Sequence, residues 1–71
     1  MKKAVFDLEP PRGDGLREVT LTITLSAGEV FAEKEASFWL WQMPGETPSQ
    51  AIEGLCKVFR LLGCDVEVKN V

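Results

Sequence analysis

The chain has 71 residues, a net charge of −3 and no histidine, and these totals already exclude several classes of function. A chain of this length forms one domain with a thin core, because it buries only about 60–65% of the surface that its unfolded form exposes. Acidic residues spread along the sequence argue against broad binding to a phosphate backbone, which depends on clustered lysine and arginine. Without histidine the commonest general base is missing, so we expect residues 1–71 to form a single domain that is not an enzyme.

The two cysteines, Cys56 and Cys64, are expected to be free thiols in a reducing compartment. Two cysteines without histidine do not make a structural zinc site, and a disulfide between a helix and the residue just past its end is poorly motivated. The N-terminal segment has two lysines but no apolar run behind them, which argues against a signal peptide. We therefore expect a cytoplasmic protein with no cofactor, no bound metal and no membrane span.

The first predicted strand covers residues 3–9, KAVFDLE, in which apolar side chains occupy alternate positions. It ends at residues 10–15, PPRGDG, because the two prolines lack backbone donors and Asp14-Gly15 is a strong turn pair. Residues 17–25, REVTLTITL, follow with strict alternation of aliphatic residues and threonines. That pattern is typical of a half-buried strand.

Residues 30–41 allow two interpretations. Ser26 and Glu29 have the spacing of a helix capping box, which would begin a helix at Ala27. Such a helix would scatter the consecutive large residues of the segment FWLW over all of its sides. A strand separates them cleanly onto two faces, so we favour a strand that pairs with residues 17–25.

A tight turn at Ala27-Gly28 gives this hairpin a consistent register, because Gly28 suits the positive φ of such turns. In that register Leu25 faces Val30 and Ile23 faces Ala32, so every core-facing position meets another core-facing position.

A helix is clearly marked after Gly45. Thr47 is its predicted N-cap, Pro48 takes the first helical position, and Gln50 completes a capping box. Gly63 ends it. We expect the inner stripe to be Ile52, Leu55, Phe59 and Leu62, with Cys56 on its flank. A last strand is predicted over residues 64–71.

The resulting order predicts a two-layer β-β-β-α-β domain of the α+β class, with one helix packed on one face of a four-stranded antiparallel or mixed sheet. The aliphatic face of the sheet is expected to take the helix. The other face is left open, and its aromatic and acidic residues form the predicted protein-binding set: Trp39, Trp41, Phe31, Glu33 and Glu35.

Tryptophan is enriched at interaction hot spots, and glutamates steer a protein towards basic surfaces. The sequence therefore suggests a small acidic inhibitor or adaptor that binds a protein. The specific form, a phage-type inhibitor of a bacterial nucleic-acid-binding system, is an analogy from size and charge. A homodimer, formed face to face or edge to edge, is left open. So is a structure in which the tryptophans pack under the N-terminal segment or on Pro10, Pro11 and Met43.

Two other interpretations use the same residues, and a third concerns the first turn. Aromatic side chains on an open sheet can stack bases, although neighbouring glutamates would repel the phosphates of a single strand. Glu33 and Glu35 would lie about 7 Å apart by strand rise, but nothing around them indicates a catalytic carboxylate pair. The RGD sequence of Arg12–Asp14 is interpreted as a turn rather than as an adhesion motif.

The segment GETPSQAIEGL, Gly45 to Leu55, resembles the turn and helix start of HicB-type antitoxins, a family that also has the order β-β-β-α-β. The resemblance covers about eleven residues, and the Pro-Asp-Leu-Pro-Gly-Cys segment of that family is missing before the helix. It implies an alternative function, namely an antitoxin whose partner is a small toxic ribonuclease.

Overall fold

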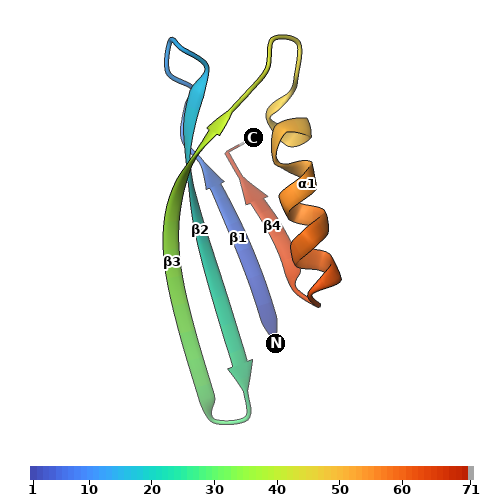
Figure 1. Ribbon diagram of the computed structural model, residues 1–71. Coiled ribbons are helices and arrows are strands. Elements are labelled where there is room, and N and C mark those ends of the chain that lie inside the picture. Colours follow the sequence, from blue (N-terminus) through green and yellow to red (C-terminus); the bar gives the residue numbers. More distant parts are fainter. Residues whose placement is uncertain (71) are drawn as a thin grey trace.

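A computed structural model describes residues 1–70 and has four strands and one helix, in the order β1 (Lys2–Leu8), β2 (Leu16–Ala27), β3 (Val30–Trp41), α1 (Pro48–Leu61) and β4 (Asp65–Lys69). The strands form one sheet in the order β3-β2-β1-β4 (Figure 1). Neighbouring strands are antiparallel except β1 and β4, which are parallel. The mixed sheet with one helix confirms the predicted two-layer α+β fold.

The β2–β3 hairpin is the longest feature of the sheet. Its pairing runs without interruption from Leu16 opposite Trp41 to Ala27 opposite Val30, which confirms the predicted strand over residues 30–41. The predicted register was wrong by two residues, since Leu25 faces Ala32 instead of Val30. Gly28 takes the first position of the turn with a φ of 60°, as a type II′ turn requires. An even shift keeps every side chain on its predicted face.

The N-terminus of α1 has the predicted capping box. The Gln50 backbone N–H donates to Thr47 Oγ1 at 3.1 Å, and the Thr47 N–H donates to Gln50 Oε1 at 2.9 Å. Each bond satisfies a donor that the helix itself leaves unpaired. At the other end Gly63 adopts a φ of 87°, a conformation that side chains disfavour, and so ends the helix.

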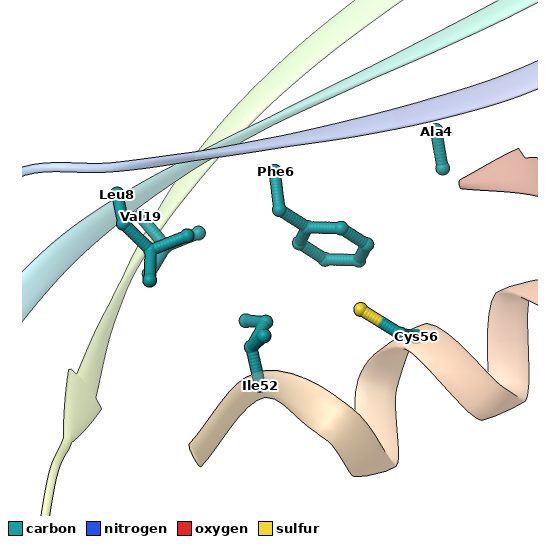
Figure 2. Packing of buried hydrophobic residues seen from close by; sticks show 6 residues of the cluster. All are labelled: Ala4, Phe6, Leu8, Val19, Ile52 and Cys56. Atoms are coloured by element: carbon teal, nitrogen blue, oxygen red, sulfur yellow. The ribbon is translucent and has the colours of Figure 1, made fainter. Parts of the chain in front are cut away.

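The core lies between α1 and the β1–β2 part of the sheet. Figure 2 shows Phe6 of β1 pointing towards α1, between Ile52 and Cys56. The ring of Phe6 also meets Phe59 edge-on, with centroids 5.5 Å apart. The buried apolar residues of this core come from β1, β2 and α1: Ala4, Phe6, Leu8, Val19, Ile52 and Cys56.

The helix is rotated relative to the predicted stripe. Cys56, expected on the flank, is buried at its centre, whereas Leu55 and Leu62 are exposed. The reason is that Phe6 lies opposite Ile52 and Cys56, which turns the Leu55 side of the helix outward. Both cysteines are free, as predicted.

The helix covers only part of the aliphatic sheet face. In Figure 1, α1 lies beside β4, and the β2–β3 hairpin extends past the N-terminal end of β1. Val30 is 69% exposed, and Leu25, Ala32 and Ala36 are exposed on the same face. The prediction that the helix takes this face was therefore only partly right. A helix of 14 residues spans about 21 Å, whereas strands of 12 residues span about 40 Å.

Candidate protein-binding face

The open sheet face is the side turned away from α1. The β2–β3 register places the odd-numbered residues of β3 on it, opposite the even-numbered residues of β2. Trp39 therefore lies across from Glu18, and Trp41 lies across from Leu16. All five residues of the predicted binding set belong to this face, because side chains alternate strictly along an unbroken strand.

The two tryptophans form an exposed aromatic end of the face. Trp39 is 53% exposed and Trp41 is 58% exposed. The guanidinium of Arg12 lies over the ring of Trp39, 5.3 Å from its centroid, and also pairs with Asp14 at 3.3 Å. The β1–β2 loop thus touches the tryptophans but leaves more than half of each side chain exposed. Packing of the tryptophans under the N-terminal segment or on Pro10, Pro11 and Met43, the alternative interpretation, is therefore at most partial.

A hollow of about 530 Å³ lies beside Trp41, between residues 11–15 and residues 41–45. Gly15 forms part of its wall with a φ of 83°, and a Cβ there would lie 3.4 Å from Trp41 Nε1. Glycine at this position lets the loop approach the indole closely. The hollow therefore lies at the tryptophan end of the β2–β3 hairpin, between the two loops.

The middle of β3 is acidic. Glu33 lies opposite Thr24, and Glu35 lies opposite Thr22. Neither glutamate makes an ion pair with any residue in the described range 1–70, whereas Glu67 on the β4 side of the same face pairs with Lys3 at 3.1 Å. The two carboxylates on β3 therefore present uncompensated negative charge, and Glu35 lies four residue steps from Trp39, about 13 Å by strand rise.

Phe31 is separated from the rest of the set. It lies near the hairpin turn, opposite Ser26 and 65% exposed. Eight residue steps divide it from Trp39, which is about 26 Å by strand rise. The structure therefore brings Trp39 and Trp41 together and Glu33 and Glu35 together, but it does not bring Phe31 to the tryptophans within one chain.

Sequence reasoning missed Arg12, which it treated only as part of a turn. The turn itself was predicted, and it is closed by backbone bonds from Arg12 N to Leu16 O and from Gly15 N to Arg12 O. Because Leu16 pairs with Trp41, this turn comes back over the tryptophan end of the sheet. Only the hairpin register, which the sequence did not determine, could have placed Arg12 over Trp39.

Comparison with protein-family models, curated proteins and solved structures finds no match to this chain. Within residues 1–70, no helix has the length and apolar character needed to cross a membrane. The function is therefore inferred from the geometry of the open face.

Proposed function

We propose that the protein is a small non-enzymatic interaction module that docks the open face of β2 and β3 onto another protein. The observation that supports this most directly is the pair Trp39 and Trp41, neighbours on one face and each more than half exposed. Exposed apolar side chains rimmed by polar groups mark association sites, and tryptophan is enriched among residues that dominate binding energy.

The charge of the face indicates the chemistry of the partner. Glu33 and Glu35 lie in the middle of β3 on the same face, without an ion pair in residues 1–70, and the whole chain has a net charge of −3. Such a surface attracts a basic protein surface and speeds association at low salt. An inhibitor of a bacterial nucleic-acid-binding protein, of the kind that phages make, is the specific form we propose. The free thiols support a cytoplasmic location.

The test combines stability with capture of a partner. The double substitution Trp39→Ala and Trp41→Ala should abolish capture of a host protein while leaving far-UV circular dichroism and the unfolding midpoint nearly unchanged. Val58→Ala with Leu62→Ala is a matched control, since these side chains are also exposed but lie on α1 and at its C-cap, away from the open face. It should retain capture. Loss of the fold in the tryptophan variant, or equal loss of capture in both variants, would contradict the proposal.

Replacing the two glutamates of β3 by glutamine tests whether their charge speeds association with the partner. Glu33→Gln with Glu35→Gln should slow association with the captured partner and reduce its dependence on salt, because charge pairs act chiefly on the association rate. An association rate that does not change would show that the glutamates are not at the interface.

A single-strand nucleic-acid binder is a second candidate, because Arg12 over Trp39 combines a cation with a stacking surface. Titration of the tryptophan fluorescence with oligonucleotides at low salt tests it, and absence of quenching would eliminate it. The HicB-like antitoxin is favoured only by the shared β-β-β-α-β order. The capture experiment decides it, since the partner would be a small ribonuclease.

A further inference from the structure

The outer edge of β3 is an open pairing surface. β3 ends the sheet on one side and has 12 residues, with an unbroken register and no proline. The other edge strand, β4, has only five residues, and Asp65, Glu67 and Lys69 alternate along it. Short charged strands are a common protection against edge pairing, whereas long regular strands invite it.

The backbone hydrogen bonds between β2 and β3 define which groups of β3 are available for a further strand. The Gln42 N–H donates to Gly15 O at 3.2 Å, which continues the β2–β3 ladder through an even-numbered residue. On β2, Ser26 N donates to Met1 O, so even-numbered residues of β2 bond to β1 and odd-numbered ones bond to β3. The even-numbered residues of β3 thus bond to β2. The odd-numbered residues 31–41 direct their N–H and C=O groups to the open edge.

We propose that a second copy of this chain pairs with that edge, antiparallel, about a twofold axis at Ala36. Residues directly opposite each other in an antiparallel pair lie on the same face, so the numbers of two facing residues must both be odd or both be even. The twofold axis must therefore pass through a residue of β3, which we call the centre of the pairing. Two centres use nearly the full strand. A centre at Glu35 pairs residues 30–40 of the two copies, and a centre at Ala36 pairs residues 31–41.

Charge selects between these centres. A centre at Glu35 would place this carboxylate directly opposite its own copy, and like charges in that position are destabilising. A centre at Lys34 would do the same with two ammonium groups and would also place Glu33 opposite Glu35. A centre at Ala36 places Glu35 opposite Ser37, and no two charged residues of β3 face each other. A centre at Ser37 also avoids like charges but uses fewer residues of the strand.

The register centred on Ala36 also assembles the separated parts of the open face. Phe31 of one copy lies opposite Trp41 of the other, and Glu33 lies opposite Trp39. Since Arg12 covers Trp39, each Glu33 carboxylate meets the guanidinium of the second copy. Aromatic cross-strand pairs and opposite charges both stabilise sheets. The pairing thus brings together side chains that lie far apart within one chain.

On the helix side, Lys34 faces Phe38 of the second copy in this register. The aliphatic stem of lysine packs on apolar surface while its ammonium group remains in water. Neither face therefore places two like charges directly opposite each other along residues 31–41.

Cysteine cross-linking tests the register directly. Ala36 is a position that does not hydrogen-bond at the new edge, so its Cα would lie about 4.5 Å from its copy, within disulfide range. Ala36→Cys should form a covalent dimer under mild oxidation, with mass spectrometry locating the bond at position 36. Ala32→Cys is the matched control, being the same change on the same strand face, exposed like Ala36. It would lie about 26 Å from its copy and should not cross-link.

A second measurement uses light scattering of the unmodified protein over a dilution series. The wild type should change from dimer to monomer, and Ser37→Pro should be monomeric over the same range. Proline at this odd-numbered position removes a donor at the open edge without breaking the β2 ladder. Circular dichroism checks that the variant is folded, and if it is not, the cross-linking pair decides alone. A wild type that is monomeric throughout, or cross-linking of Ala32→Cys as efficient as that of Ala36→Cys, would overturn the proposal.

This pairing does not depend on the proposed protein partner. The second copy extends the sheet at the backbone edge of β3 and lies beside Trp39 and Trp41, so it does not cover the open face on which a partner would dock. Failure of capture with a normal dimer would reject only the partner. A monomer that still captures its partner would reject only the dimer.

Discussion

Replacement of Leu8 by alanine is the most direct test of where this small domain gets its stability. Leu8 is 1% exposed in the core, and Figure 2 shows its side chain next to Val19. Removing a buried leucine side chain costs about 2–5 kcal/mol, the sum of lost burial and the remaining cavity. A chain of 71 residues at about 0.05–0.15 kcal/mol per residue has a total stability of about 3.5–11 kcal/mol. Leu8→Ala should therefore remove a large part of the stability of the domain.

Leu61→Ala is the matched control, because it makes the same chemical change at a side chain that is 88% exposed at the end of α1. Alanine has the better helix propensity, so the free energy of unfolding should change by less than about 0.5 kcal/mol. Urea denaturation followed by far-UV circular dichroism measures both variants. If Leu8→Ala does not fold, Ile52→Val should still show a loss of about 0.5–1.5 kcal/mol. Equal effects of Leu8→Ala and Leu61→Ala would refute the assignment of the core to the β1–α1 interface.

Two further predictions concern the helix and its buried thiol. Gly54→Ala, in the interior of α1 with open space around its Cβ position, should stabilise the protein by about 0.5–1 kcal/mol. Gly63→Ala should destabilise it, because alanine disfavours the φ of 87° at that position. Thermal melts of both variants should therefore shift in opposite directions. Burial raises the pKa of the Cys56 thiol above its ordinary value of 9.0, with Glu53 adding to the rise and Arg60 opposing it. The stability gained by keeping this thiol protonated is present below pH 9.0 and is lost as the pH rises through the folded-state pKa. Urea midpoints across this range should fall more steeply for the wild type than for Cys56→Ala, and equal slopes would contradict the prediction.

The elements were predictable where one local signal dominates. Strict alternation over residues 17–25 requires a strand, and Thr47 with Gln50 defines a helix start whose hydrogen bonds the structure contains. The hairpin register was not determined by such a signal. Turns at Ala27-Gly28 and at Gly28-Glu29 differ by an even shift and leave the same side chains on each face. The choice between them depends on turn geometry, because a type II′ turn needs glycine at its first position. The alternation of apolar and polar residues carries no information about the turn type.

The rotation of α1 was less predictable, because apolar residues occupy a wide arc of this helix. Ile52, Leu55, Cys56 and Leu62 are all suitable for burial, and the position of the helix over the sheet determines which of them are buried. The order β3-β2-β1-β4 places α1 beside β4 and over Phe6, so Ile52 and Cys56 are enclosed. The sequence does not state the strand order. The placement of Arg12 over Trp39 was unpredictable for the same kind of reason, since it depends on tertiary register.

The difference in length between helix and hairpin has consequences for function. A helix of about 21 Å beside strands of about 40 Å leaves half of the hairpin without cover on either face. The exposed side chains there include Val30, Phe31 and Leu25, and beside them lies a free backbone edge. Shortening both strands near the turn would remove this exposed area at little cost to the core, because none of the six enclosed residues comes from that end of the hairpin. An uncovered hairpin that the core does not require is most simply explained by binding another chain. The proposed pairing with a second copy would use this half of β3 along its backbone edge, whereas Trp39 and Trp41 mark the other end of the hairpin.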